Sequence, residues 1–505
     1  MTDLTPAPGS QRPALQPAGS ALGARDLARR ADDERSAVRP DRPPPVAIVL
    51  AAGKGTRMQS RRHKVLHPLA GKPMIWHVLR ALQDAGLPPE RTVVVVGESA
   101  PEVCAAIEDG FGAGRYAFAA QAPLLGTGHA VLQARPYVPA EAGTVLVAYG
   151  DTPLLRPATV RRLLEQHGEA AAQVTLVTGS LPDPSGYGRI IRDARGGVQA
   201  VVEEREATPE QLAVCEVNSG FCAFDPQWLW SWLPLVQPAP NGEIYLTALA
   251  SLAAAEGATI ATIQLDDIVE VLGVNTRAQL AEAEATLRQR QARRLLEAGV
   301  TLQDPATTYV DVEVEVGADT VILANTHLQG ATTIGAACEI GPNAIIRNSR
   351  LADRCRVVAS VLDGAVLDEG VTVGPFAHLR PGTRCGRAVE VGTGSEIKAS
   401  SLGAGSRMHH FGYLGDAVVG EQVNIGAGTV TCNYDGTRKH QTHVGDRAFI
   451  GSDTLLVAPV RVGAGALTGA GAVVLHDVPD GAKVAGVPAR QIGVRGEPKP
   501  EPAAE

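Results

Sequence analysis

The sequence has few aromatic residues, few cysteines and no long apolar run, and each shortage excludes a class of protein. Aromatic residues make up 4% of the 505 residues, so the cores are expected to consist of small aliphatic side chains. The seven cysteines are odd in number and scattered, without a C-x-x-C pair. This argues against a disulfide framework and against a structural zinc site.

Membrane and nucleic-acid binding are also disfavoured. No apolar run approaches the roughly 18 residues that a membrane helix needs, and the N-terminus has no apolar signal core. The net charge is -8, which does not suit a nucleic-acid-binding surface. We therefore expect a cytoplasmic protein with small-molecule substrates, in which local groups of Lys and Arg can still hold a phosphate.

The N-terminal half alternates between strand-like and helix-like patterns. Residues 1–45 are rich in Pro, Ala, Arg and Asp and are predicted to be a disordered tail. Strand-like runs lie at 45–50, 92–96, 143–148 and 173–177, with helical patterns at 73–83 and 158–167 between them. Over 46–276 this predicts a Rossmann-like α/β domain with a mainly parallel sheet, whose ligands bind at the carboxyl ends of the strands.

The C-terminal half repeats every six residues. Residues 277–299 favour a helical linker. Over 300–490 aliphatic residues recur at a six-residue spacing, and the longest series is Val444, Ile450, Leu456, Val462 and Thr468. This is the hexapeptide signature of a left-handed parallel β-helix, which needs oligomerisation to bury its flanks. Residues 491–505 are predicted to be a second disordered tail.

A glycine-rich loop follows the first strand. It runs Leu50-Ala-Ala-Gly-Lys-Gly-Thr-Arg-Met58 and lacks the spacing of both a P-loop and a dinucleotide fingerprint. The loop offers a strand end, two glycines that allow close approach to phosphate, and cations, with Lys64 and Lys72 following. An ordinary basic turn is the alternative.

Two further elements favour nucleotide chemistry. A second glycine turn at 126–130 suits packing against a flat base or sugar. Asp151 comes directly after a buried strand, where one carboxylate can bind Mg²⁺ if triphosphate oxygens complete the octahedron. The alternative for Asp151 is a cap of the next helix.

Polar groups in the β-helix exceed what a structural solenoid needs. They lie between Arg380 and Lys439, and the segment 432–439 breaks the six-residue register, which predicts a projecting loop. A histidine here suits N-acetylation, because an incoming ammonium group must lose a proton before it attacks a thioester. Direct transfer of an acetyl group from the thioester to the amine needs no covalent acyl-enzyme, so Cys432 need not be a nucleophile.

Taken together, LAAGKGTRM, the Lys of KVLH, LAGKPM, GTGHA and YGD resemble the sugar-nucleotide pyrophosphorylases. From about Val46 to about Gly493 the chain resembles the family of bifunctional N-acetylglucosamine-1-phosphate uridylyltransferase / glucosamine-1-phosphate N-acetyltransferases. The resemblance implies acetylation of glucosamine-1-phosphate with acetyl-CoA, then transfer of UMP from UTP, giving UDP-N-acetylglucosamine and pyrophosphate for cell-envelope synthesis. It also implies a homotrimer with acetyltransferase sites between neighbouring β-helices.

The resemblance also implies residue roles. In the first half it assigns the UTP phosphates to Arg57 and Lys64, Mg²⁺ to Asp151 and Asn275, and the amino sugar to Gly188, Glu203 and Asn218. Other nucleotide or sugar contacts would be Leu50, Ala51, Gly53, Gln121, Gly126, Thr127 and Tyr149. In the second half His410 would be the base and His409 has no role. The sugar phosphate would meet Arg380, Lys398, Tyr413, Asn424 and Lys439, and acetyl-CoA would meet Asn433, Tyr434, Ser452 and Ala470.

Some positions depart from the family pattern, and two other interpretations stay open. His63 stands where a proline usually precedes the lysine, Leu124 stands where a second glutamine is common, and Ser60-Arg61-Arg62 is unusually rich in arginine. One alternative is a single-activity nucleotidyltransferase whose β-helix only oligomerises. The other is a non-catalytic hexapeptide scaffold. The set Arg380, Lys398, His410 and Lys439 speaks against the first, and Gly53, Lys64 and Asp151 speak against the second.

Overall fold

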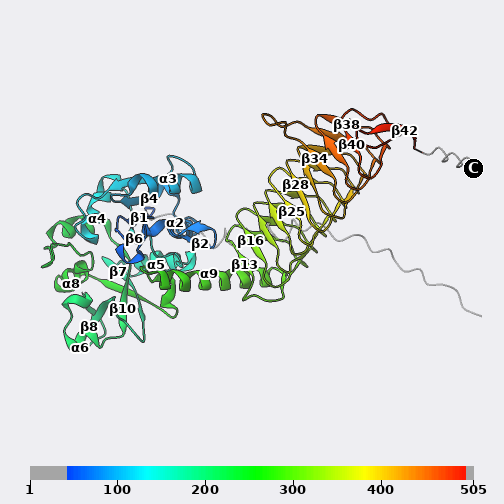
Figure 1. Ribbon diagram of the computed structural model, residues 1–505. Coiled ribbons are helices and arrows are strands. Elements are labelled where there is room, and N and C mark those ends of the chain that lie inside the picture. The colour runs from blue at the N-terminus through cyan, green and yellow to red at the C-terminus, as the bar shows by residue number, and fades with distance from the viewer. Residues whose placement is uncertain (1–42, 496–505) are drawn as a thin grey trace, which may run out of the picture.

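An α/β domain and a stack of short strands are joined by one long helix (Figure 1). The computed structural model describes residues 43–495. The predicted tails 1–45 and 491–505 lie mostly outside the described residues. At the C-terminal boundary, β42 (Arg490–Val494) pairs antiparallel with β41 (Ala482–Ala485). The ordered chain therefore continues past residue 490, because this pairing satisfies backbone groups of the last full coil.

The sheet of the α/β domain is built around β1 (Val46–Ala51). β1 pairs in parallel with β4 (Thr92–Val96) and β6 (Val145–Tyr149). The strand order is β11-β7-β10-β6-β1-β4-β5, with β5 (Ala117–Ala120), β7 (Val174–Ser180), β10 (Glu216–Phe224) and β11 (Ile260–Leu265). β10 runs antiparallel to β6 and β7, so the predicted mainly parallel sheet is confirmed, with β10 reversed in its central order. An antiparallel ribbon of β8 (Gly188–Arg192) and β9 (Val198–Val202) extends from β10.

The alternation of side chains along β1 divides the domain into two cores. Ala47, Val49 and Ala51 belong to one core, and Ile48 belongs to the other, as expected because successive strand residues point to opposite faces. The first core is covered by α2 (Met74–Asp84), α3 (Ala100–Phe111) and α5 (Pro157–Glu169), and the second by α4 (Thr127–Ala134), α7 (Pro226–Trp232) and α8 (Ala248–Ala255). Only strand ends and loops remain for ligands.

The connector is α9 (Arg277–Glu297). It begins with a capping box in which Thr276 accepts from the Gln279 backbone and the Gln279 side chain accepts from the backbone of Thr276. Its buried residues recur every four positions, which places them on one face: Ala283, Leu287, Gln291 and Leu295. The cap fixes the start of α9 directly after Asn275.

The β-helix consists of three parallel sheets of short strands in register. They hold 12, 10 and 9 strands, and the chain visits them in turn; β42, the last strand of the 12, is the antiparallel exception. Ile322 pairs with Ile340, and Ile340 with Val357, so aliphatic residues stack inside the prism. The five residues of the longest predicted series are all buried, with exposures of 0–4%. The hexapeptide β-helix is confirmed.

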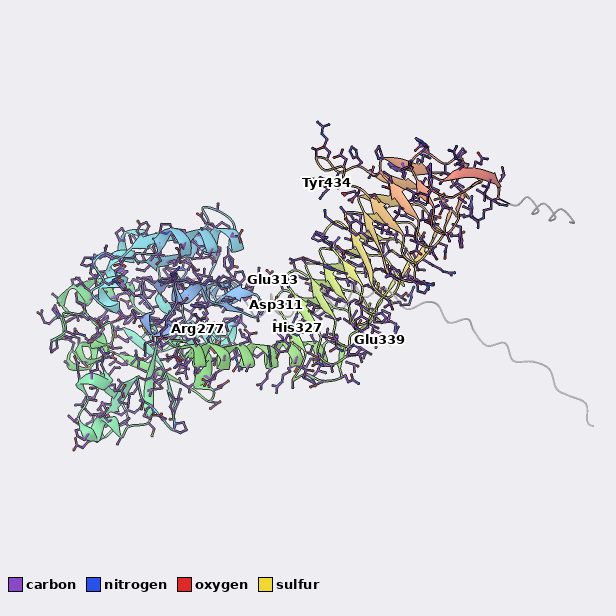
Figure 2. The ribbon with its side chains drawn as sticks, viewed as in Figure 1. Arg277, Asp311, Glu313, His327, Glu339 and Tyr434 are labelled. Carbon is purple, nitrogen blue, oxygen red and sulfur yellow. The ribbon has the colours of Figure 1, made fainter. Side chains whose placement is uncertain are left out.

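The first coil of the β-helix contacts the α/β domain through the hairpin of β2 (Pro68–Leu69) and β3 (Lys72–Pro73). The Val312 backbone donates to the Ala70 carbonyl at 3.1 Å, and Lys72 Nζ lies 2.7 Å from the Glu313 carboxylate. The Ala70 backbone also donates to Glu284 of α9 at 2.8 Å. Figure 2 shows Asp311 and Glu313 at this junction. The hairpin that follows the Lys64 segment is thus held by α9 and by the β-helix together.

Replacing Leu456 by Ala tests the β-helix core. Leu456 is fully buried in the single aliphatic core of the prism, so we expect a loss of about 2–5 kcal/mol in unfolding free energy. The measurement is denaturant unfolding followed by circular dichroism. The matched control is Leu235→Ala, because Leu235 is 58% exposed and should change stability by less than about 0.5 kcal/mol. Equal effects of both substitutions would contradict the assigned packing.

Candidate functional sites

A cavity of about 350 Å³ opens at the carboxyl ends of β1 and β6. Its position agrees with the rule that parallel sheets bind ligands at this edge. The structure brings nine of the residues singled out in the sequence to its wall: Leu50, Ala51, Gly53, Lys64, Gln121, Gly126, Thr127, Tyr149 and Asp151.

Three polar side chains converge beside this cavity. The Lys64 ammonium forms an ion pair with Asp151 and donates to Asn275 Oδ1 at 3.0 Å. The side chains of Lys64 and Asp151 are only 12% and 16% exposed, so the charges are partly shielded from water and interact more strongly than a surface pair. Two hard oxygen donors therefore share one cation here, and this is the kind of donor that Mg²⁺ prefers.

The two glycines of the first loop differ in their surroundings. Gly55 has φ 61°, and a Cβ placed on it would lie 2.5 Å from Lys64 Cβ. Glycine is required there because a side chain would displace Lys64. A Cβ on Gly53 would meet nothing within 4 Å, so the space above Gly53 is open to a ligand. Arg57 is exposed on the short helix η1 (Thr56–Met58) and is not part of the cavity wall.

The second glycine turn is fixed by a segment that sequence reasoning missed. The Ile244 backbone donates to the Leu125 carbonyl at 2.8 Å, and Gly128 donates to the Ile244 carbonyl at 2.8 Å. This pairing brings Glu243 and Tyr245 to the cavity wall. A signal was present in the polar, glycine-containing run 241–247, but nothing in its spacing connects it to residues 126–128.

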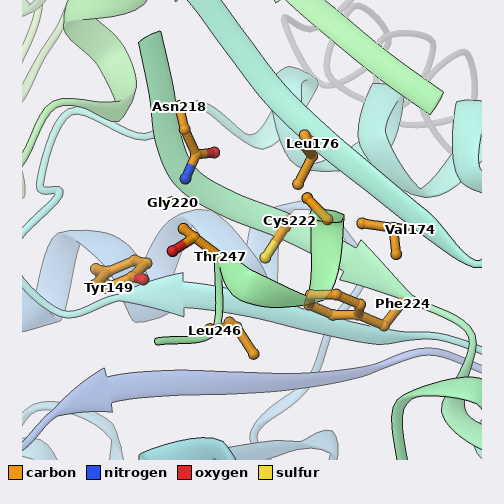
Figure 3. A pocket seen from close by; sticks show the side chains of 10 residues that line it. Tyr149, Val174, Leu176, Asn218, Gly220, Cys222, Phe224, Leu246 and Thr247 are labelled. Atoms are coloured by element: carbon orange, nitrogen blue, oxygen red, sulfur yellow. The ribbon is translucent and has the colours of Figure 1, made fainter. Parts of the chain in front are cut away.

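Of the predicted sugar residues, Asn218 lies with Tyr149 at a small cavity of about 10 Å³ (Figure 3). Tyr149 also lines the large cavity. Gly188 pairs with Asn218 across two strands, and Thr247 donates to Glu203 at 2.8 Å. Asn218 is buried, and its Oδ1 has no hydrogen-bond partner among residues 43–495. A buried acceptor without a partner is costly, so this oxygen suits a donor group of a ligand.

Two of the three departures from the family pattern, Leu124 and His63, lie in or beside the wall of the large cavity. Leu124 lines it and packs against the second core. His63 is 8% exposed, and burial lowers the pKa of its imidazole below the ordinary value, so His63 adds no charge beside Lys64 at neutral pH.

In the β-helix, one group of predicted residues gathers on the 10-stranded sheet. The registers of β25 (His378–Leu379) and β28 (Ser395–Lys398) place Arg380 beside Lys398 on successive coils. Arg380 donates to Glu396 at 2.8 Å. The neighbouring Lys398 lowers the pKa of Lys439, so these two like charges lie close together. Such a cluster suits an anion.

The projecting loop predicted at 432–439 is present and connects β34 (Val430–Cys432) with β35 (Thr442–Val444). Asp435 orders it by accepting from the backbones of Thr437 and Arg438, each at 2.7 Å. Tyr434 is 61% exposed at its base (Figure 2). Asn433 donates to Asp416 and lies beside the Tyr413 hydroxyl over Gly415.

A second group of predicted residues lies along a different corner of the prism. His410 follows β30 (Arg407–Met408) of the 12-stranded sheet, where the chain turns towards β31 (Gly412–Gly415). Ser452 and Ala470 stand at the same turn two and three coils further on, linked by Gly471 donating to the Ser452 carbonyl at 2.8 Å. Asn424 projects from the adjoining 12-stranded sheet. One chain therefore divides its predicted acetyltransferase residues between two places.

The adjacent histidines differ in their contacts. His409 Nε2 lies 2.8 Å from the Glu390 carboxylate. The His410 side chain is exposed, and within residues 43–495 its ring has no hydrogen-bond partner. Its backbone carbonyl accepts from Ser395 at 2.9 Å, which fixes the turn and leaves the ring available to a substrate.

The described residues contain neither a self-sufficient metal cluster nor a helix fit to cross a membrane. Within residues 43–495 no three or more His, Cys, Asp or Glu side chains are grouped so that they could hold a metal ion by themselves. Over the same range no helix combines the length and apolar character needed to cross a membrane. A cation at Asp151 and Asn275 would therefore need ligand oxygens to complete its coordination.

Known proteins match the α/β domain alone and the two domains together. Residues 47–304 match the family described as MobA-like NTP transferase domain. The chain is 49% identical over 437 residues to bifunctional protein GlmU of Heliobacterium modesticaldum and 48% identical over 437 residues to that of Pelobacter propionicus, covering 86% of this chain and 94% of each relative. It is 46% identical to bifunctional protein GlmU of Carboxydothermus hydrogenoformans, covering 86% of this chain and 95% of that protein. With a nucleotidyltransferase sheet, a hexapeptide β-helix and this identity over nearly all of its described length, the chain belongs to the bifunctional GlmU family.

Proposed function

We propose that the chain acetylates glucosamine-1-phosphate with acetyl-CoA in its β-helix and then transfers UMP from UTP to N-acetylglucosamine-1-phosphate in its α/β domain. The products are UDP-N-acetylglucosamine and pyrophosphate, for cell-envelope synthesis. The observation that carries the proposal is the convergence of Lys64, Asp151 and Asn275 at the mouth of a cavity of nucleotide size.

In the uridylyl transfer, a phosphate oxygen of the sugar phosphate attacks the α-phosphorus of UTP and the bond to pyrophosphate breaks. Lys64 and Arg57 hold the triphosphate and stabilise the charge that spreads over its oxygens. Gln121 is held in place by donating to the Gly126 carbonyl at 2.9 Å, so it meets the base without reorganising. Asn218 and Glu203 bind the acetamido sugar.

Asp151 and Asn275 are the residues that would hold Mg²⁺. Their oxygens already share the Lys64 cation, and a carboxylate with an amide oxygen fits a hard divalent ion. When bound, the ion would neutralise phosphate charge. Lys64, which contacts Asp151 in this structure, would be available to the phosphates of the nucleotide.

Replacing Lys64 by Met removes the charge and keeps the length of the side chain. We expect pyrophosphate release from UTP, Mg²⁺ and N-acetylglucosamine-1-phosphate to slow by about 10²–10³-fold, with CoA release at the other site unchanged. The control is Lys54→Met, because Lys54 is in the preceding glycine loop but pairs with Glu98 at the surface. If Lys64→Met stays within a few-fold of the parent, the assignment of Lys64 is wrong.

In the acetyl transfer, the amine of glucosamine-1-phosphate attacks the thioester carbonyl of acetyl-CoA. The N–C bond forms, the C–S bond breaks, and the proton passes from the amine through His410 to the CoA thiolate. Arg380, Lys398 and Lys439 bind the sugar phosphate, since their close positive charges favour a dianion. Asn433, Tyr434, Ser452 and Ala470 meet acetyl-CoA.

A homotrimer would unite the two groups of acetyltransferase residues. In one chain His410 and Ser452 are at the corner between the 12-stranded and the 10-stranded sheet. Arg380 and Lys398 are at the opposite, C-terminal ends of strands of the 10-stranded sheet. Packing β-helices around a threefold axis sets one corner against a neighbour's sheet. Each active site then takes its base from one subunit and its phosphate-binding cations from another.

The two adjacent histidines give a matched test of the base. His410→Ala should lower CoA release by about 10²–10⁴-fold and leave pyrophosphate release unchanged. His409→Ala removes only the contact with Glu390 and should keep CoA release within a few-fold. Equal losses for both variants would mean that the turn, and not the His410 imidazole, is required.

Mixing two inactive variants tests whether sites form between subunits. His410→Ala and Lys398→Ala subunits are unfolded, mixed in equal amounts and refolded together, with each variant refolded alone as the control. If sites are shared, random assembly restores about a quarter of the parent CoA release. A site is intact only when one subunit keeps His410 and its neighbour keeps Lys398, which is true of one arrangement of two neighbours in four. No gain over the separate variants would place the whole site within one chain.

A further inference from the structure

A second large cavity lies on the side of α9 that faces α2, away from the nucleotide site. Its volume is about 330 Å³, which is within the range of about 300–1,000 Å³ typical of ligand pockets. The helices α2 and α9 form its walls, and residues 153–157, which follow Asp151, form its floor. We call it the α2–α9 groove. None of the residues assigned above to either transfer reaction lines it.

Part of the groove lining is apolar. Trp76 of α2, Leu287 of α9, and Pro153, Leu155 and Pro157 of the floor belong to this part. The indole of Trp76 stacks on Phe111, and Lys72 Nζ lies 5.4 Å from its ring centroid. The indole is only partly buried, so the part that lines the groove offers an apolar contact to a ligand. An apolar or aromatic group would therefore be stabilised here.

The rim of the groove is positively charged. Arg80 comes from α2, and Arg290 and Arg294 come from one face of α9 at a spacing of four residues. Asp84 is the one carboxylate among the lining residues, and it already pairs with Arg80 at 3.0 Å. His77 is buried, with Nε2 2.9 Å from the Leu69 carbonyl, and burial lowers the pKa of its imidazole. The groove therefore carries a net positive charge.

Arg290 supplies the most specific observation. Its Nη1 donates to the Leu154 carbonyl at 2.7 Å, while its Nη2 is buried without a hydrogen-bond partner among residues 43–495. The nearest acids are engaged elsewhere, since Arg156 pairs with Asp267 and Glu270, and Glu270 also accepts from Thr159. A buried guanidinium donor without an acceptor is costly, and an anion in the groove would satisfy it.

We propose that the α2–α9 groove binds a small organic anion, with its phosphate or carboxylate against Arg290, Arg80 and Arg294 and its apolar body on Trp76. A ligand there contacts the segment that follows Asp151 and the helix that begins after Asn275. The site therefore adjoins the segment that follows Asp151, whereas its α9 residues begin at Leu287, about 18 Å of helix beyond Asn275. It does not overlap the nucleotide cavity.

The test follows tryptophan fluorescence while phenyl phosphate is added to the full chain with saturating UTP and Mg²⁺, which keep the probe out of the nucleotide cavity. We expect saturable quenching that disappears in Trp76→Phe. Arg290→Gln should weaken binding at least tenfold through loss of a charge-assisted hydrogen bond. The matched control is Arg293→Gln, an exposed arginine of α9 outside the groove, which should change the affinity less than twofold.

Two further arms keep the result decisive. Arg290→Gln also loses the hydrogen bond to the Leu154 carbonyl, and it could therefore act by changing the local structure. Arg80→Gln changes an exposed position and should weaken binding independently. Both transfer reactions are measured for each variant to show that it is folded. Phenol, which has the ring without the charge, should bind at least tenfold more weakly than phenyl phosphate. Quenching that does not saturate, that survives in Trp76→Phe, or that is equal in Arg290→Gln and Arg293→Gln would overturn the proposal.

Discussion

The contact of Lys64 with Asp151 and Asn275 joins three segments that are far apart in the chain. Lys64 follows the glycine loop after β1, Asp151 follows the end of β6, and Asn275 precedes the cap of α9. Because the three side chains share charge in a partly buried place, moving any segment leaves a charge or a polar group unpaired. The position of the phosphate loop, the sheet edge and the connector helix is therefore set by one constraint, and the β-helix follows because α9 leads into its first coil.

The β-helix obeys a different constraint, the need to repeat. Each coil must present an aliphatic residue inward at the same height, which leaves the outward positions and the turns free to vary. Several of the residues that we propose for acetyl transfer lie at turns of the repeat or at an insertion into it. His410 occupies a turn, and the Asn433–Lys439 insertion projects between β34 and β35. A regular prism thus supplies rigid positions for a few exceptional residues.

Local patterns predicted the elements well, and contacts between distant segments less well. The run 92–96 is β4 as expected, and the six-residue series is buried as the hexapeptide pattern requires, because both follow from side-chain periodicity alone. Glu243 and Tyr245 were missed because their approach to the cavity depends on backbone pairing with residues 125–128. The sequence also did not predict that His410 lies apart from Arg380 and Lys398, since this separation depends on which corner of the prism each turn occupies.

The distance between the two sites decides how the reactions relate. α9 has 21 residues, which corresponds to about 31 Å of helix. From β12 to β30 the 12-stranded sheet advances by six coils, through β15, β18, β21, β24 and β27, or about 28 Å at the usual strand spacing. No side chain reaches across such a separation, so the two sites can share no catalytic group. The acetylated sugar phosphate must leave the β-helix before it enters the nucleotide cavity, and the single chain serves to fix the ratio of the two sites while each reaction keeps its own machinery.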